Sequence, residues 1–374
     1  MVGGNCVLIT CDTVVPEFYP VSLPFVLLEI APFMRHPTYL LTLLLACLVT
    51  ASCALPESLE SDLPELMPIF RSSFEGDVQV VDHTEQAAFF TGADPTVESP
   101  NDFDQLNPPY LTKFNIQYLG GDLSQRAASI ERDPEDASNR VLRFRLTDPG
   151  DKIKGRVQAQ TTTETGFREL RYTYRMRLGD GWRTLANLPR RSGWFIMSEF
   201  WNGPPWTGHP YPFRAHLTLT NHRSVAEPGI YAGLLSETIP RDGEKERIWA
   251  LKNHEIKLPI GEWFLVEVYI KEGGAETGRF VFRIRTADGG RHTVFDRTGF
   301  THHPENPTPD GIRFFHPMKM YMGRSVVEAA VEGEGALEIY YDDFELFGLP
   351  VEFGEEKAEQ WFGHQFTIKI LNDS

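Results

Sequence analysis

The sequence predicts an all-β protein, an antiparallel β-sandwich of the jelly-roll type. From about residue 139 onward, short segments of alternating apolar and polar residues follow one another at brief intervals, as in half-buried strands. Turn signals such as Gly179-Asp180-Gly181 and Asp288-Gly289-Gly290 separate these segments. Aromatic residues make up 12% of the chain, beside 31 Gly and 27 Pro, which suits strands joined by tight turns better than helices.

The first part of the chain predicts export. Residues 1–33 are apolar in patches interrupted by prolines, and we interpret them as an over-extended start. Residues 34–54 form a signal peptide whose apolar region, 39–49, is too short for a comfortable membrane span. Its end resembles a bacterial lipoprotein signal, in which Cys53 would be lipidated and anchor the protein; cleavage after Ala54 is the alternative. In both cases we expect an extracellular, periplasmic or outer-membrane protein.

One folded domain is expected after the signal. Residues 55–73 are acidic and contain prolines, which predicts a linker. The domain is expected to span 74–348, with long loops and little regular structure up to about Ile130 because prolines recur there. The tail, 349–374, would add an edge strand at 365–371.

The predicted strands follow the alternation of apolar residues in this domain. They cover residues 139–146, 155–162, 168–178, 193–201, 213–220, 230–236, 247–258, 262–271, 279–286, 292–296, 318–323 and 336–347.

Charge and cysteine content narrow the classes of partner. The formal net charge of −16 argues against a nucleic-acid-binding protein, since neutralising phosphates requires clustered Lys and Arg. All four cysteines lie within the first 53 residues, so the domain has no disulfide and no thiolate metal or redox site. A chain of this length can bury a sufficient core, and we expect a monomer.

An aromatic segment predicts a sugar-binding floor. Alternate residues of a strand share a face, so Met197, Glu199 and Trp201 are expected to point the same way. Arg214 and His216 share a face of the next strand. Rings stack on sugars while fixed polar groups orient hydroxyls or carboxylates. The alternative is an ordinary wall of the sandwich, whose aromatic residues belong to the core.

Several motifs occur in a recognisable order. They are Gly155-Arg156-Val157-Gln158, the strand from Trp194 to Trp201, Gly261-Glu262-Trp263 with Gly278 after the following strand, Lys319-Met320-Tyr321-Met322-Gly323, and Tyr340-Tyr341-Asp342-Asp343-Phe344-Glu345-Leu346. In this order they resemble strands of the concanavalin A-like jelly-roll polysaccharide lyases of the heparin lyase I and alginate lyase type. The resemblance covers roughly residues 74–347. Gln158 stands in place of an acid of that pattern, Glu199 in place of Gln, and Trp201 in place of the catalytic His.

The resemblance implies cleavage of an acidic, uronic-acid-containing polysaccharide by β-elimination, with no cofactor required. The reaction needs a group that neutralises the carboxylate, a base for the C5 proton and an acid for the leaving oxygen. Tyr321 would act as base and then acid, since neighbouring cations can lower the pKa of a tyrosine. Arg156 and Arg214 would neutralise the carboxylate, and His216 would be the base if Trp201 has displaced the usual one. The implied substrate-binding residues are Gln158, Glu199, Trp201, Trp206, Lys319 and Arg324.

Two other functions remain open on the same fold. A glycoside hydrolase needs two carboxylic acids, and Glu199 would have to pair with Glu169 or Glu237. A lectin-like module without catalysis would use aromatic side chains as stacking surfaces. These would be Trp194, Trp201, Trp206, Tyr211 and Trp249.

Asp342 and Asp343 suggest a structural Ca²⁺ site, as in relatives of this fold. Carboxylate oxygens are the ligands that Ca²⁺ prefers. The alternative is that these residues merely cap the strand edge.

Overall fold

The structure, a computed structural model, describes residues 62–188, 193–203, 208–221, 227–239 and 246–351. The export signal with Cys53, Trp206 and the edge strand expected at 365–371 lie outside these residues. Among the described residues, no helix combines the length and apolar character needed to cross a membrane.

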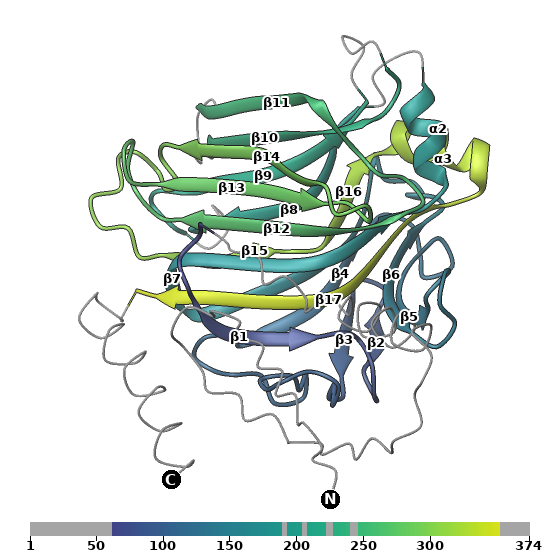
Figure 1. Ribbon diagram of the computed structural model, residues 1–374, viewed down its shortest axis with the longest axis horizontal. Coiled ribbons are helices and arrows are strands. Elements are labelled where there is room, and N and C mark those ends of the chain that lie inside the picture. Colours follow the sequence, from purple (N-terminus) through teal and green to yellow (C-terminus); the bar gives the residue numbers. More distant parts are fainter. Residues whose placement is uncertain (1–61, 189–192, 204–207, 222–226, 240–245, 352–374) are drawn as a thin grey trace, which may run out of the picture. The chain divides into compact units, whose positions relative to one another are not determined.

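The described part of the folded unit contains 17 strands, joined by antiparallel pairings (Figure 1). The strands are β1 (Met67–Ser72), β2 (Gln79–Thr84), β3 (Ala87–Thr91), β4 (Lys113–Leu119), β5 (Arg126–Arg132), β6 (Arg140–Leu146), β7 (Lys154–Leu178), β8 (Phe195–Trp201), β9 (Phe213–Thr220), β10 (Ile230–Thr238), β11 (Arg247–Leu258), β12 (Trp263–Lys271), β13 (Arg279–Arg285), β14 (Arg291–Thr298), β15 (Ile312–His316), β16 (Lys319–Gly323) and β17 (Leu337–Pro350).

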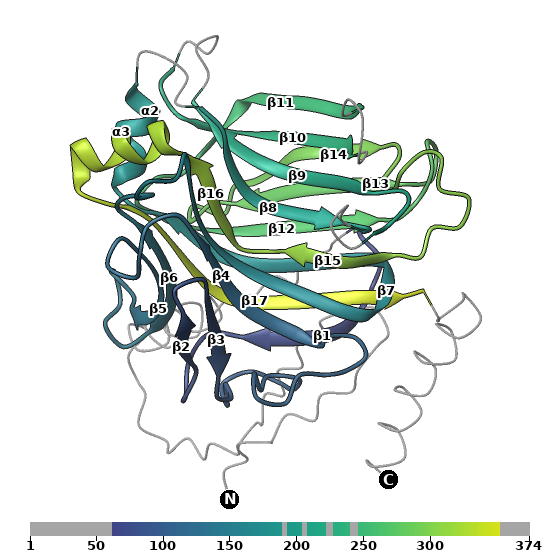
Figure 2. The same ribbon diagram turned by 180° about the vertical axis from the view of Figure 1, so that it is seen from behind.

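The long strand β7 joins two layers of strands. Its first part, up to Thr162, lies between β4 and the pair β15–β16. Its second part, from Phe167 onward, lies between β12 and β17. Layer A therefore runs β2-β3-β4-β7-β15/β16-β8-β9-β10-β11, and layer B runs from β1 and β6 through β17, β7, β12 and β13 to β14. Figure 1 views the molecule from layer B, and Figure 2 from layer A.

Aromatic side chains fill the space between the layers. Phe200 of layer A meets Phe280 of layer B with ring centroids 5.8 Å apart, and Phe114 meets Phe344 at 5.4 Å. The hydroxyl of Tyr172 in layer B is hydrogen-bonded to that of Ser198 in layer A. The predicted all-β antiparallel sandwich is therefore confirmed.

Two short helices, which the sequence did not predict, lie together at one end of the layers (Figure 1). These are α2 (Gly181–Asn187) and α3 (Arg324–Glu334). In α3, Val326, Val327 and Ala330 are buried on one face. Such a short helix is stabilised by packing of its apolar face more than by its own hydrogen bonds.

The folded unit begins earlier than predicted. Residues 67–72, expected to belong to the linker 55–73, form β1, which pairs with β17. Phe70 is fully buried there, and Pro68 is tolerated because the strand is at an edge. The region expected to consist of loops contains the short strands β2, β3, β4 and β5, and the prolines lie in the connection between β3 and β4.

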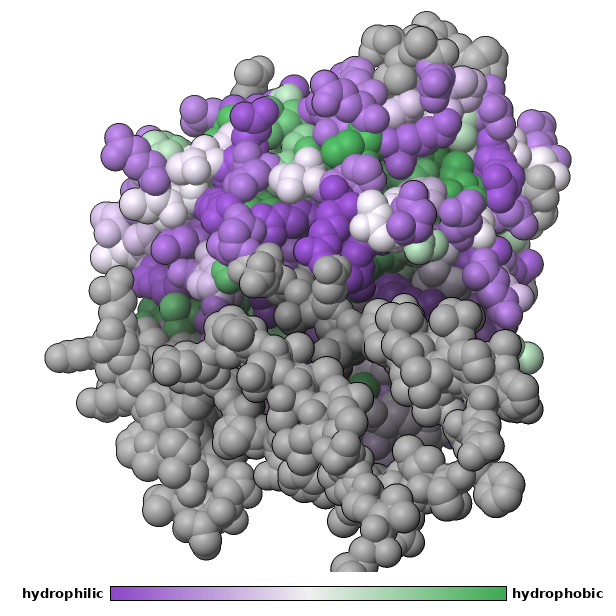
Figure 3. Space-filling model, in the orientation of Figure 1, coloured by the Kyte–Doolittle hydropathy of each residue, from purple (hydrophilic) through white to green (hydrophobic). Residues whose placement is uncertain are grey.

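The surface of layer B is largely hydrophilic where the described residues are visible (Figure 3). Salt bridges such as Arg279 to Asp296, at 2.7 Å, and Arg283 to Glu267, at 3.4 Å, lie on β12, β13 and β14. The described surface of this layer therefore resembles an ordinary solvated face.

We expect the passage of β7 between the layers to depend on Gly166. A Cβ atom at this position would overlap the backbone oxygen of Asp310. Gly166→Ala should therefore lower the free energy of unfolding by about 3 kcal/mol, measured by urea denaturation. The control is Gly274→Ala, where the nearest atom to a new Cβ is a Phe300 ring carbon at 3.8 Å, so its cost should stay within about 0.5 kcal/mol. Equal effects of the two substitutions would contradict the assigned role of Gly166.

Candidate active site

A polar cluster lies on the outer face of layer A, around Glu199 of β8. Directly opposed residues of antiparallel strands project their side chains from the same face. Glu199 is opposed by His216 of β9 and by His316 of β15. The three side chains therefore share one face, although 117 positions separate Glu199 from His316 in sequence.

Three basic groups surround the carboxylate of Glu199, whose side chain is only 3% exposed. Nη1 of Arg214 lies 3.1 Å from Oε1, and Nδ1 of His316 lies 3.3 Å from Oε2. The ammonium of Lys319 forms an ion pair with Oε2. A buried carboxylate is costly unless it is compensated, and here partners from β9, β15 and β16 compensate it.

These contacts set the charge states of the cluster. Burial alone would raise the pKa of Glu199, but Lys319, His316 and Arg214 hold it well below its usual range. Burial lowers the pKa of Lys319 to about 8, against the attraction of Glu199. Burial and the nearby Lys319 lower the pKa of His316 to about 4. Near neutral pH, Glu199 and Lys319 are therefore charged and His316 is neutral.

Arg214 links the two acidic side chains of this face. It contacts Glu199 and forms a second ion pair with Glu237 of β10. Its guanidinium also lies over the Trp201 ring, 5.3 Å from the centroid. Trp201 is 4% exposed, so its ring supports Arg214 and does not form an open stacking surface.

Tyr321 of β16 stands between cations. The Arg156 guanidinium carbon lies 5.9 Å from the centre of its ring, and Nζ of Lys319 lies 5.1 Å from it. The edge of Trp194 closes another side, with centroids 4.9 Å apart. Tyr321 is directly opposed by Arg156 in the register of β7, which explains why the two side chains meet.

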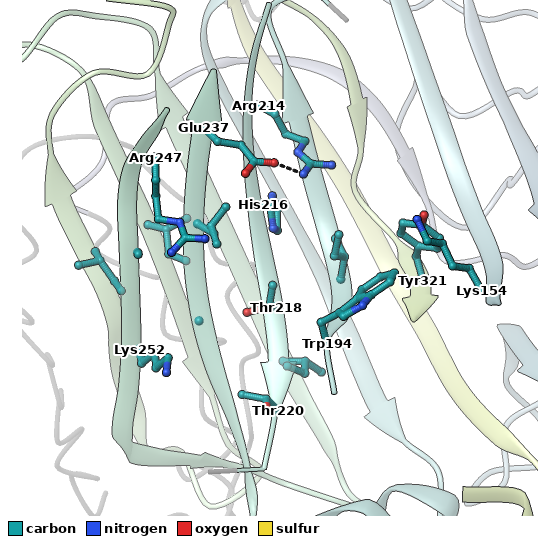
Figure 4. A pocket seen from close by; sticks show the side chains of 17 residues that line it. Lys154, Trp194, Arg214, His216, Thr218, Thr220, Glu237, Arg247, Lys252 and Tyr321 are labelled. Carbon is teal, nitrogen blue, oxygen red and sulfur yellow. Dashed lines mark hydrogen bonds and ion pairs between the residues drawn. The ribbon is translucent and has the colours of Figure 1, made fainter. Parts of the chain in front are cut away.

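Two pockets meet at Tyr321 and Arg214. The first, which we name the Tyr321 pocket, has a volume of about 300 Å³. It is lined by Gln117, Arg156, Gln158, Glu199, Trp201, Arg214, Ile239, Phe314, His316, Lys319 and Tyr321. The second has a volume of about 490 Å³ and extends over β9, β10 and β11, and we name it the β9–β11 pocket (Figure 4).

Most of the predicted site residues line the Tyr321 pocket. His216 is an exception. It lines the β9–β11 pocket, which shares Tyr321 and Arg214 with the first (Figure 4). Gln158 lies in the Tyr321 pocket and donates to Oε1 of Gln117 at 3.0 Å. Trp206 lies outside the described residues.

Arg324 was wrongly placed at the site. It begins α3 and donates to the backbone oxygens of Gly150 and Lys152, so it fixes a neighbouring loop. Arg324 lies only three positions from Tyr321 in sequence. The chain leaves the sheet at Gly323 and forms a helix from Arg324, so the two residues do not share a strand.

The expected orientation of Met197, on the same face as Glu199 and Trp201, was also wrong. A register shift in the pairing of β8 with β9, between Ile196 and Ser198, reverses the alternation. Ile196 therefore lines the β9–β11 pocket, and Met197 is buried in the core. A bulge inserts one residue and cannot be read from apolar alternation alone.

Sequence reasoning missed His316 and Gln117. His316 follows two phenylalanines and precedes the Lys319 motif by three positions, so the available signal was one more short strand before that motif. Gln117 lies on β4, in the region that was expected to consist of loops.

Asp342 and Asp343 face a guanidinium. Arg175 lies 3.3 Å from Asp342 and 3.6 Å from Asp343, and Asn139 donates to Asp342 at 2.9 Å. Burial and the charge of Asp343 raise the pKa of Asp342 to about 7. No group of three or more His, Cys, Asp or Glu side chains in the described ranges is placed to hold a metal ion. The arrangement does not fit Ca²⁺, because Arg175 already supplies the positive charge.

His316 should make stability dependent on pH. Its pKa falls from the ordinary 6.5 to about 4 on folding, so acid protonates the unfolded chain first. The stabilisation is present above about pH 6.5 and is lost as the pH falls toward about 4. Between about pH 7 and about pH 5, the free energy of unfolding should fall by about 2 kcal/mol from this group.

Urea denaturation of His316→Gln at both pH values measures that contribution, because the variant should show a correspondingly smaller fall. His83→Gln, at an exposed histidine of β2, should behave like the unmodified protein. Parallel losses in all three proteins would remove His316 as the cause.

Comparisons with family models and with curated protein sequences give no match. Solved structures similar to this chain include an alginate lyase mutant in complex with an alginate tetrasaccharide, 16% identical with a TM-score of 0.42, covering 63% of this chain and 88% of that one. An endo-β-1,4-glucuronan lyase from the fungus Trichoderma reesei is 14% identical, with a TM-score of 0.41 and coverages of 64% and 95%. A family 16 endo-glucanase from Bacteroides ovatus is 11% identical, with a TM-score of 0.42 and coverages of 66% and 98%. The chain is thus similar to lyases, the class that its motifs resemble, and to a glycoside hydrolase.

Proposed function

We propose that this protein is a polysaccharide lyase that cleaves a uronic-acid-containing polysaccharide by β-elimination. The observation that carries the proposal is Arg156. Its guanidinium is largely buried beside Tyr321, and burial lowers its pKa. No acidic side chain in the described ranges forms an ion pair with it. A desolvated cation without a counter-ion is a site for an anion, and a uronate carboxylate would supply one.

The substrate carboxylate would bind Arg156, with Lys319 nearby. Neutralising it makes the C5 hydrogen of the sugar acidic, since charge that develops at the carboxylate is stabilised by fixed cations. Gln158 donates its amide to Gln117, so its own carbonyl oxygen is left to accept a hydrogen bond from a sugar hydroxyl. These side chains would orient the sugar against Tyr321.

Tyr321 would then transfer the proton. As a phenolate, with Arg156 and Lys319 beside its ring, it takes the C5 proton while the C4–O bond breaks and a C4–C5 double bond forms. The resulting phenol gives the same proton to the leaving glycosidic oxygen, which regenerates the phenolate. His216 is a poorer candidate for the base, since it lines the neighbouring pocket.

Hydrolysis fits the site less well. Glu199 and Glu237 are both paired with Arg214, and the pKa of Glu199 is held well below its usual range. A glycosidase requires one protonated carboxylic acid beside the glycosidic bond. Glu169 accepts a hydrogen bond from Tyr269 of layer B at 2.5 Å and lines neither pocket.

A lectin-like function also has less support. Trp201 is buried beneath Arg214, and Trp249 packs against the core. These two rings therefore do not present open faces for sugars, whereas the cations and Tyr321 form a set that fits proton transfer.

The sequence adds a location to this proposal. Residues 34–54 support export, with Cys53 as a lipid anchor, which would place the enzyme where it meets extracellular polysaccharides.

The reaction can be tested by incubating the purified protein with alginate, glucuronan, heparin-type and ulvan-type polymers. Cleavage should produce the ultraviolet absorbance of unsaturated uronates. Tyr321→Phe should lower kcat at least about 1,000-fold while leaving substrate binding intact, because the hydroxyl transfers the proton. Tyr340→Phe, which removes a hydroxyl bonded to Glu338 outside both pockets, should retain activity.

Full activity of Tyr321→Phe would exclude this residue from proton transfer. New reducing ends without unsaturation would indicate a hydrolase, and binding without any cleavage would indicate a lectin-like protein.

A further inference from the structure

The β9–β11 pocket extends the Tyr321 pocket across layer A. Tyr321 and Arg214 line both pockets, so one continuous ligand can occupy them. From β16 the second pocket crosses β8, β9 and β10 and ends at β11 (Figure 4). With strands about 4.8 Å apart, four spacings give roughly 19 Å, enough for several sugar units.

Three cations of this pocket have no acidic partner in the described part of the chain. Lys154 enters from β7 and lies 5.9 Å from the centre of the Trp194 ring. Arg247 and Lys252 enter from β11 at the opposite side, and both are exposed (Figure 4). No ion pair joins any of the three to a described carboxylate, in contrast to Arg214, which has two.

The charge of the two pockets is opposite to that of the protein. Their described linings contain six Lys and Arg side chains and two acidic ones, while the whole chain carries a formal charge of −16. The two acidic side chains, Glu199 and Glu237, form ion pairs with Arg214 and Lys319, which neutralise their charges. A cleft lined by one sign of charge concentrates ligands of the opposite sign.

Polar groups that suit a sugar lie between these cations. His216 and Thr218 project from β9 into the pocket, and the edge of Trp194 bounds it (Figure 4). Hydroxyl and imidazole groups can exchange hydrogen bonds with sugar hydroxyls, while the flanking cations bind acid groups.

We propose that the β9–β11 pocket is a second anion-binding subsite, which holds the acid group of a sugar unit further along the same polysaccharide than the one at Tyr321. Arg247 and Lys252 bind that group from β11, whereas Lys154, at the β7 end of the pocket, binds an acid group close to Tyr321. The substrate is accordingly a polysaccharide with acid groups, carboxylates or sulfates, on several of its units. This inference rests on the proposed function, since it takes the sugar at Tyr321 as the point of cleavage.

Calorimetric titration of the full chain with an oligouronate of six units and one of two units tests this subsite. The double variant Arg247→Gln/Lys252→Gln should weaken binding of the six-unit ligand roughly tenfold for each charge removed. It should leave binding of the two-unit ligand, which fits the Tyr321 pocket alone, within about twofold. The control is Arg132→Gln/Arg297→Gln, which removes two exposed charges outside both pockets and should change neither affinity.

Equal affinities of the double variant and the unmodified protein for the six-unit ligand would overturn the subsite. So would an equal loss for both ligand lengths. A sulfated oligosaccharide and a neutral one of equal length identify the acid group: the double variant should weaken binding of the acidic ligands, and an equal loss for the neutral one would refute anion recognition. Ultraviolet absorbance, recorded separately, reports on β-elimination. If this absorbance does not appear but binding depends on ligand length, the proposed lyase activity is refuted and the proposed subsite is still supported.

Discussion

The buried carboxylate of Glu199 is the interaction on which the rest of the site depends. Removing a carboxylate from water costs several kcal/mol, which only close partners can offset. Its partners come from different strands: Arg214 from β9, His316 from β15 and Lys319 from β16. The carboxylate thereby fixes the side chains of strands that are distant in sequence. We infer that Glu199 positions Lys319 and Arg214 for a substrate and does not itself meet the sugar.

This neutralisation determines which charges remain for a ligand. Glu199 and Glu237 balance Arg214 and Lys319, so these four groups contribute little net charge. Arg156 is then left as an unbalanced, desolvated cation beside Tyr321. The cluster thus separates two roles: paired charges hold the geometry, and unpaired ones bind anions. A site formed of paired charges alone would offer a polyanion no net attraction.

The sequence could place side chains on a common face of one strand, but not their neighbours on other strands, because strand alternation is local and pairing is not. Arg156 and Gln158, or Lys319 and Tyr321, could be placed on one face from their spacing. The bulge at Met197, the helix that begins at Arg324 and the contact of His316 with Glu199 depend on register and on partners far along the chain. Likewise, the predicted strands 155–162 and 168–178 proved to be one strand, β7, whose two parts serve different layers. The alternation of apolar residues predicts which side chains of a strand are buried, but it does not predict which strand lies beside it.

The replacement of the expected histidine by Trp201 has a physical explanation in this arrangement. Trp201 supports the guanidinium of Arg214, which is held there by two carboxylates. A histidine at this position would face the same guanidinium, whose charge would oppose protonation of the imidazole. Proton transfer by an imidazole would therefore be weakened here, and in the proposed reaction Tyr321 of β16 takes that role. The charge that would oppose an imidazolium at position 201 is that of Arg214, whereas Arg156 and Lys319 flank Tyr321, so the departure from the lyase pattern and the proposed proton transfer involve different cations of one cluster.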